Sequence, residues 1–190
     1  MLNLEIEVKY EVSRIGIRAI NKFIKDNFEP IHERVLLDIV DDYYRVNGQP
    51  LRHRYSTLYE WNELTWKAKT HKDNTVRHEI NLLLRDSDPT SIANVSTMIE
   101  QLGGEFDFQL WKEYARIYEL EDVILSLYSA QTFTSKQYLF FEIEVKNDKV
   151  KSVKQAEELL LSYQNKFSSI IPPSLIFPES IIELFSNYPT

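Results

Sequence analysis

Hydrophobic and polar residues alternate with a period of two along most of the chain, in segments rich in Val, Ile, Tyr, Phe and Trp. This period is typical of β-strands, whose successive side chains point to opposite faces of a sheet. Short turns such as Asn47-Gly48 separate consecutive segments, which favours antiparallel pairing. The pattern predicts strands near residues 3–11, 34–46, 50–58, 61–70, 76–84, 110–120, 122–129 and 138–146.

Four other segments have the three-to-four-residue spacing of amphipathic helices. They predict helices over residues 13–27, 89–102 and 152–167, and a short one over 179–187. Ser13 and Ser152 are suited to cap the first and third helices, and Gly103-Gly104 to end the second. With eight predicted strands, we expect an α+β fold whose antiparallel sheet closes into an eight-stranded β-barrel with flanking helices.

The composition narrows the class of protein. The 190 residues contain four glycines and no low-complexity linker, so we expect a single domain over residues 1–190. The absence of cysteine excludes disulfides and thiolate metal sites. The start MLNLEIEVKY does not resemble a signal peptide, and no apolar run has the length of a membrane span, so we expect a cytoplasmic protein. The net charge of -7 makes a broad nucleic-acid-binding face unexpected.

Charged side chains recur on one phase of the alternation in most predicted strands. The sequence EIEVK occurs twice, at residues 5–9 and 142–146, and places two glutamates and a lysine on one face each time. The central strands contribute mainly Arg and Lys on the shared phase. Two arrangements explain this pattern: an open sheet with a solvated charged face, or a closed barrel with a polyanion in its lumen. The charges concerned are Glu5, Glu7, Lys9, Arg52, Arg54, Lys67, Lys69, Arg77, Glu79, Lys112, Arg116, Glu142, Glu144 and Lys146.

Repulsion between the cations favours the closed barrel with a polyanion in its lumen. Long cationic side chains on adjacent strands need an anion among them. The paired glutamates are hard oxygen ligands of the kind that suits Mg²⁺ or Mn²⁺. Phosphoryl transfer requires mainly positioning and neutralisation of charge by metal ions, Arg and Lys. The chain has no Walker A, G-x-G-x-x-G or G-x-S-x-G motif. Its four histidines lack metal-ligand spacing, and we expect His53 and His78, on the opposite phase, to be structural or exposed.

At these residues the sequence resembles the CYTH, or triphosphate tunnel metalloenzyme, superfamily. The resemblance covers about residues 3–186, and the order of the motifs makes it specific. The superfamily has successive strands with E-x-E-x-K, an aromatic pair after Asp, L-R-x-R, L-T-x-K, R-x-E, a basic R-x-Y strand and E-I-E. In this chain they correspond to Glu5–Lys9, Asp42-Tyr43-Tyr44, Leu51–Arg54, Leu64–Lys67, Arg77–Glu79, Lys112 with Arg116–Tyr118, and Glu142–Glu144.

The resemblance implies an eight-stranded antiparallel tunnel in which inward Arg and Lys side chains bind triphosphate and glutamates bind Mg²⁺ or Mn²⁺. It implies a closing helix for the segment ESIIELF, and Lys9, Glu79 and Arg54 as catalytic residues. The implied metal ligands are Glu5, Glu7, Glu142 and Glu144, assisted by Glu79. The implied phosphate-binding residues are Lys9, Arg52, Arg54, Lys67, Lys69, Arg77, Lys112 and Arg116.

Three departures bear on the chemistry. Asn81 stands where many members have a second acid, Tyr114 where a basic residue is common, and the segment Ser126–Tyr128 where many have an aspartate. These differences argue against a second metal ion and leave open which group activates the nucleophile.

The expected reaction is metal-dependent hydrolysis of an inorganic, organic or nucleoside triphosphate in a basic tunnel. One alternative is a class IV adenylate cyclase, which converts ATP to cyclic AMP and pyrophosphate. Another is a module that binds triphosphate or polyphosphate without turnover. An RNA 5′-triphosphatase is disfavoured by the acidic net charge. We expect a small-molecule triphosphate as the partner and no membrane, and a homodimer is left open.

Overall fold

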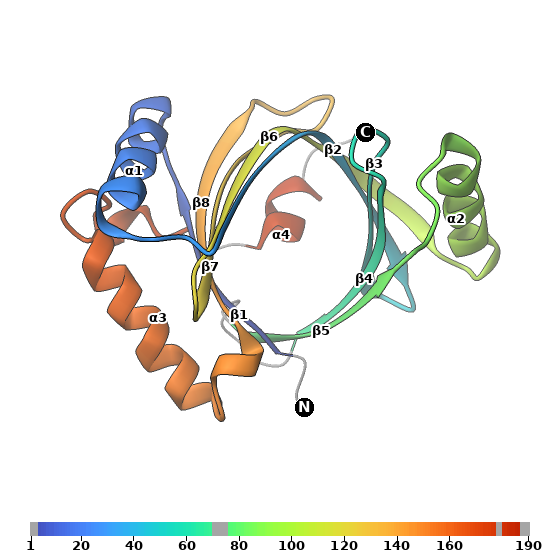
Figure 1. Cartoon of the computed structure of the whole chain (residues 1–190). Helices are drawn as coiled ribbons and strands as arrows, with labels where there is room; N and C mark the ends of the chain where they lie inside the picture. The colour runs from blue at the N-terminus through green and yellow to red at the C-terminus, as the bar shows by residue number, and fades with distance from the viewer. Residues whose placement is uncertain (1–3, 70–75, 178–179, 187–190) are drawn as a thin grey trace.

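The structure, a computed structural model, describes residues 4–69, 76–177 and 180–186. Eight antiparallel strands form a closed barrel in the order β1-β5-β4-β3-β2-β6-β7-β8 (Figure 1). The predicted α+β fold with an eight-stranded barrel is therefore confirmed. The strands are β1 Leu4–Glu11, β2 His32–Val46, β3 Gln49–Ser56, β4 Trp61–Lys69, β5 Val76–Leu83, β6 Glu105–Glu119, β7 Val123–Ala130 and β8 Tyr138–Val145.

The barrel closes at β1, which pairs with β5 on one side and with β8 on the other. Glu7 is the direct partner of Glu144, and Lys9 is that of Glu142. The two EIEVK segments thus lie side by side and antiparallel. Because successive side chains of a strand point to opposite faces, both copies turn their glutamates into the lumen and their branched apolar residues outward. Lys9 also lines the lumen, whereas Lys146 lies just beyond β8 and pairs with Glu119 instead. The alternative of an open, solvated sheet is wrong.

Two helices, α1 (Arg14–Asn27) and α3 (Val153–Phe167), cover the outer face of the barrel beside β1, β7 and β8 (Figure 1). As predicted, Ser13 accepts a hydrogen bond from the backbone N–H of Gly16, and Ser152 accepts one from that of Gln155. Ile24 of α1 and Phe167 of α3 are fully buried in the core that these helices form with the strands. This core holds the β1–β8 seam in place.

Helix α2 (Pro89–Gln101) covers the outer face of β3 and its neighbours. Beneath it, His53 is completely buried, and its Nε2 lies 2.8 Å from Asn62 Oδ1. His53 is therefore a structural residue outside the lumen, as the strand phase predicted. Two short 3₁₀ turns, Asn147–Lys149 and Pro173–Leu175, flank α3. No helix in the described parts of the chain is both long and apolar enough to cross a membrane.

The fourth helix, α4 (Ile181–Phe185), lies inside the ring of strands rather than against its outer face (Figure 1). A capping box between Ser180 and Glu183 starts it. Ile181 and Phe185 are buried against lumenal residues that include Phe108 and Phe140. The helix lies within the predicted segment 179–187, whose residues 179 and 187 lie outside the described residues. One end of the lumen is therefore an apolar core closed by α4.

Strands β2 and β6 both change phase near their middle. Asp38 of β2 has a positive φ of 53°. On β6, Ala115 pairs with Tyr128 of β7, while Trp111 pairs with Gln131, just beyond the end of β7. A step of four residues along β6 thus corresponds to a step of three along the facing segment. Such an extra residue is a β-bulge, and it reverses which residues point inward. Lys112 consequently faces the lumen together with Ala115, rather than with Arg116.

Candidate active site

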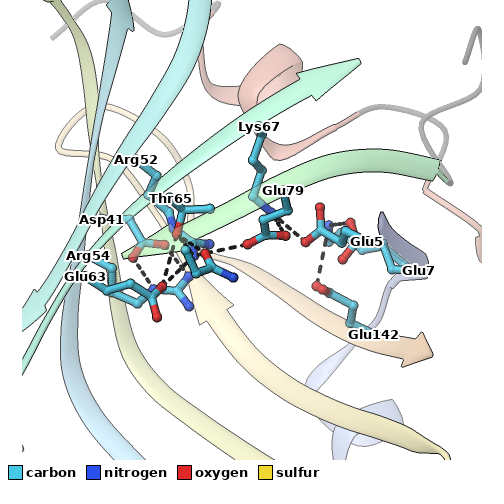
Figure 2. Close-up of polar contacts among 12 residues, drawn as sticks. Glu5, Glu7, Asp41, Arg52, Arg54, Glu63, Thr65, Lys67, Glu79 and Glu142 are labelled. Atoms are coloured by element: carbon cyan, nitrogen blue, oxygen red, sulfur yellow. Dashed lines mark hydrogen bonds and ion pairs between the residues drawn. The ribbon is translucent and has the colours of Figure 1, made fainter. Parts of the chain in front are cut away.

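The lumen contains a cavity of about 310 Å³ whose charged lining is divided between two walls. Figure 2 shows them as two clusters, one around Glu5, Glu7 and Glu142 and the other around Asp41 and the arginines. The acidic wall is formed by β1 and β8, and the basic wall by β2, β3 and β6. Strands β4 and β5 connect the two walls through Lys67 and Glu79.

On the acidic wall, two lysines lie among the carboxylates. Lys9 Nζ is 3.1 Å from Glu7 Oε1 and 3.5 Å from Glu142 Oε2. Lys67 Nζ is 2.6 Å from Glu5 Oε1. Burial and the neighbouring Glu7 raise the pKa of Glu142 to about 7. The carboxylates are thus crowded enough that two lysines only partly neutralise them.

Glu79 of β5 lies where the two walls meet. Its carboxylate is 3.5 Å from Lys67 Nζ and 4.0 Å from Arg52 Nη2. Burial raises the pKa of Glu79, but Lys67 and Arg52 more than compensate, so its pKa lies below its ordinary value. Glu79 is therefore an ionised carboxylate near both the cations of one wall and the glutamates of the other.

Arg52 is held on the basic wall by residues of β4. Its Nη2 donates to Thr65 Oγ1 at 2.8 Å and to Glu63 Oε1 at 3.1 Å. Thr65 is oriented in turn by Asn81, whose Oδ1 accepts the threonine hydroxyl at 2.7 Å. The side chain that replaces the second acid of the R-x-E strand thus supports an arginine.

Asp41 of β2 binds two further cations of this wall. Its carboxylate accepts hydrogen bonds from Arg54 Nε at 2.5 Å and Nη2 at 2.7 Å, and Lys112 Nζ lies 3.0 Å from its Oδ2. Burial raises the pKa of Asp41, but Arg54, Lys112 and Arg52 hold it well below its usual range. Asp41 is completely buried and ionised.

Tyr128 of β7 links the two walls. Its hydroxyl donates to Glu142 Oε2 at 2.7 Å, and Lys112 Nζ lies 4.7 Å from the centre of its ring. The tyrosine is in the segment where many members of the resembled superfamily have an acid. Here a hydroxyl donor fixes a glutamate and an aromatic face supports a lysine.

Apolar side chains complete the cavity. Ile181 and Ile182 of α4 line it at the closed end, and Ala115, Ile117 and Ile124 also contribute to its wall. The cavity therefore offers apolar as well as ionic contacts to a ligand.

The structure brings most of the predicted site residues together around this cavity. The lumenal ones are Glu5, Glu7, Lys9, Arg52, Arg54, Lys67, Glu79, Lys112, Glu142 and Glu144. The backbones of Lys69 and Arg77 pair with each other at the ends of β4 and β5, and their side chains lie outside the described part of the structure.

Arg116 is not among the lumenal residues. It lies beyond the β6 bulge, on the outer face, where its Nη1 donates to Asn21 Oδ1 of α1 at 3.2 Å and lies 3.3 Å from Glu33 Oε1. The structure therefore does not bring Arg116 together with the other predicted cations, contrary to the expectation from strand phase. Its partner in the motif, Tyr118, also points outward and donates its hydroxyl to Asn21.

Sequence reasoning missed three charged residues of the lumen: Asp41, Glu63 and Arg34. Glu63 is in phase with Lys67, and that signal was available in the strand WNELTWK. The motif drew attention to Asp42, but Asp42 points outward and accepts a hydrogen bond from Gln109. Arg34 precedes the phase change in β2, so alternation counted from Tyr43 does not find it.

The described lining residues are balanced in charge. Six acidic and six basic side chains line the cavity, and Asp41 adds a seventh acid. The lumen is thus not basic overall, in contrast to the expected basic tunnel, but has opposed acidic and basic walls. The acids are Glu5, Glu7, Glu63, Glu79, Glu142 and Glu144, and the bases are Lys9, Arg34, Arg52, Arg54, Lys67 and Lys112.

The acidic wall fits a hard divalent cation in donor type and charge. Its carboxylate oxygens are the ligands that Mg²⁺ and Mn²⁺ prefer, and burial and neighbouring glutamates raise the pKa of Glu144 well above its ordinary value. Among the described residues, no three Asp, Glu or His side chains already converge as a metal site. Lys9 and Lys67 instead engage these carboxylates as counterions.

No protein-family model matches the chain, and no curated protein matches it. Solved structures do match over nearly the whole chain. PH1012 protein from Pyrococcus horikoshii OT3 is 19% identical with a TM-score of 0.72, covering 95% of this chain and 98% of that protein. HpAC1 from Hippeastrum, described as having a dominant triphosphatase activity, is 14% identical with a TM-score of 0.60, covering 97% and 95%.

A Mimivirus capping enzyme triphosphatase is 14% identical with a TM-score of 0.57, covering 89% of this chain and 90% of that one. At these identities the likeness concerns the fold. The chain therefore has the closed eight-stranded fold that the sequence predicted, and it shares this fold with these solved structures.

Proposed function

We propose that this protein is a metal-dependent triphosphatase in which water attacks the terminal phosphorus of a triphosphate held in the lumen. The observation that carries the proposal is the cavity with an arginine- and lysine-lined wall opposite a wall of glutamates. Transfer of a phosphoryl group to water needs mainly positioning and neutralisation of charge, which such walls supply.

The chain's own cations would hold the phosphate oxygens. Arg52 and Arg54 are planar donors suited to bidentate contacts with phosphate, and both are fixed by neighbouring side chains before a ligand arrives. Lys112 adds a point charge beside them. Glu79, ionised and near both walls, is a candidate to orient and deprotonate the attacking water.

The residues that would hold Mg²⁺ or Mn²⁺ are Glu5, Glu7, Glu142 and Glu144, with Glu79 assisting. When bound, such an ion would neutralise phosphate charge and polarise the bond that breaks. The balance of charge in the lumen gives this proposal a further consequence. Because the described acids already offset the bases, a polyanion would bind strongly only if cations joined the acidic wall.

The apolar part of the lining supports an organic triphosphate as well as the inorganic ion. Ile117 and Ile124 could contact an organic group without competing for the phosphates. A nucleoside placed there would permit the second candidate reaction, attack of a ribose 3′-hydroxyl on the α-phosphorus to give cyclic AMP and pyrophosphate.

The test is an incubation of the protein with inorganic triphosphate, ATP, thiamine triphosphate or 5′-triphosphate RNA, with Mg²⁺, Mn²⁺ or chelator. Phosphate, pyrophosphate and cyclic AMP are measured separately. We expect phosphate release that chelator abolishes. Pyrophosphate with cyclic AMP would identify a cyclase instead.

Calorimetric titration with inorganic triphosphate accompanies the assay. We expect binding to weaken by at least about tenfold in chelator, which corresponds to about 1.4 kcal/mol. Binding without any product would identify a binding module. The absence of both binding and product would refute the proposal.

A further inference from the structure

Asp41 is an acid in a place where an anion-binding wall would be expected to exclude one. It is 0% exposed and makes two hydrogen bonds to Arg54 and an ion pair with Lys112. A buried carboxylate costs free energy unless it is well paired. Because Asp41 is paired with both Arg54 and Lys112, we take its carboxylate to be an integral part of the basic wall.

We propose that Asp41 is a positioning residue that holds Arg54 and Lys112 in the orientation and charge state needed to bind a phosphate group. The inference rests on the proposed function, since it concerns the same cavity. Asp41 acts through the two cations and need not touch the substrate.

The geometry of Arg54 supports this role. Asp41 engages the Nε and Nη2 edge of the guanidinium, while the ring of Trp61 lies 5.4 Å from its central carbon. One edge and one face of the plane are therefore fixed. The remaining nitrogen, Nη1, is not used by the pair with Asp41 and can donate to a ligand.

Lys112 depends on Asp41 for its charge. Its ammonium group is surrounded by Arg52 and Arg54 of β3, the ring of Tyr128 on β7 and Asp41 of β2. Burial and Arg54 lower the pKa of Lys112 to about 7, whereas Asp41 acts in the opposite direction. Removing the carboxylate while keeping the shape should therefore lower the pKa of Lys112 further, so that the amine is harder to protonate when a phosphate group binds.

Asp41→Asn tests the inference, because asparagine keeps the shape and loses the charge. The matched control is Asp42→Asn, which alters the adjacent buried aspartate on the outer face, where its partner is Gln109. Thermal unfolding first establishes that both variants fold. We expect Asp41→Asn to weaken triphosphate binding at pH 8 by about 100-fold, with the loss becoming smaller at pH 6 as Lys112 regains its proton. Asp42→Asn should bind as the unmodified protein does.

The ε-carbon signal of Lys112, assigned in ¹³C-lysine-labelled protein with Lys112→Met, gives a readout that needs no substrate. We expect its titration midpoint to shift to lower pH in Asp41→Asn and to stay in place in Asp42→Asn. An unchanged midpoint would overturn the inference whether or not the protein hydrolyses triphosphate. Tighter triphosphate binding in Asp41→Asn would also overturn it, because the carboxylate would then be a competitor of phosphate.

Failure of the proposed function has a different signature. In one outcome, the unmodified protein neither binds nor hydrolyses triphosphate, while the Lys112 midpoint shifts as expected in Asp41→Asn. The proposed function is then wrong. The inference also fails for phosphate binding, and only the control of the Lys112 pKa by Asp41 is retained. Loss of binding equal at pH 6 and pH 8, with an unshifted midpoint, would reduce Asp41 to a structural residue.

Discussion

Glu7 and Glu144 are direct cross-strand partners at the seam where β1 and β8 close the barrel. Both side chains line the lumen, and burial together with Glu5 and Glu7 raises the pKa of Glu144 well above its ordinary value. Like charges that face each other across a strand pair destabilise a sheet unless a cation lies between them. The seam of the barrel is thus also the place where a metal ion would contribute most to stability.

Glu144→Gln should have opposite consequences with and without metal. Without metal, relief of repulsion should leave stability unchanged or raise it by up to about 1 kcal/mol, a rise in Tm of about 2–4 °C for a chain of this size. In contrast, the rise in Tm that Mn²⁺ gives to the unmodified protein should be lost. Thermal scans with Mn²⁺ and with chelator measure both effects.

The control for this experiment is Glu158→Gln on α3, which is exposed and far from the lumen. It should keep the full response to Mn²⁺. An equally large metal response in Glu144→Gln would rule out a metal at the seam.

Arg52 and Arg116 provide a matched pair on opposite faces of the barrel. Arg52 lines the cavity, whereas Arg116 contacts Asn21 and Glu33 outside it. Arg52→Ala should weaken triphosphate binding by about 10- to 100-fold, the value of one or two charge-assisted hydrogen bonds. Arg116→Ala should change it by no more than about twofold. Calorimetric titration compares them, and equal losses would contradict the phase change in β6.

The low pKa of Lys112, about 7, predicts a pH dependence of binding. Below pH 7 the ammonium group is charged and attracts phosphate, and above pH 7 the free protein has a neutral amine there. A bound polyanion raises the pKa, so binding at pH 8 should take up close to one proton. Calorimetry in buffers of different ionisation enthalpy measures this uptake.

Because triphosphate itself titrates in this range, the informative quantity is the difference from Lys112→Met. That variant should bind more weakly and lack the additional proton uptake. The same uptake in both proteins would show that Lys112 is already charged before triphosphate binds.

Alternation predicted the lumenal residues wherever a strand runs without interruption. Glu5, Arg52, Lys67 and Glu142 were found in this way. It failed on β6 because a single extra residue reverses the phase, and propensity does not reveal where a strand will bulge. The sequence therefore predicted the walls but misplaced Arg116.

The roles of Asp41 and α4 were beyond prediction for a different reason. Neighbouring aspartates such as Asp41 and Asp42 are equivalent in sequence, and their roles differ because only one faces Arg54 and Lys112. The amphipathic pattern of residues 179–187 predicts a helix but not which surface it covers. Both outcomes depend on tertiary packing.

Phe185 tests the placement of α4 inside the lumen. Its side chain is 0% exposed, and its ring centre lies 5.4 Å from that of Tyr138 and 6.1 Å from that of Phe108. Phe185→Ala should therefore lower the free energy of unfolding by about 3–5 kcal/mol, the usual cost of such a cavity. The control is Phe133→Ala, since Phe133 is 99% exposed and should contribute little. Chemical denaturation measures both variants, and a loss below about 0.5 kcal/mol in Phe185→Ala would mean that α4 does not fill the barrel end in solution.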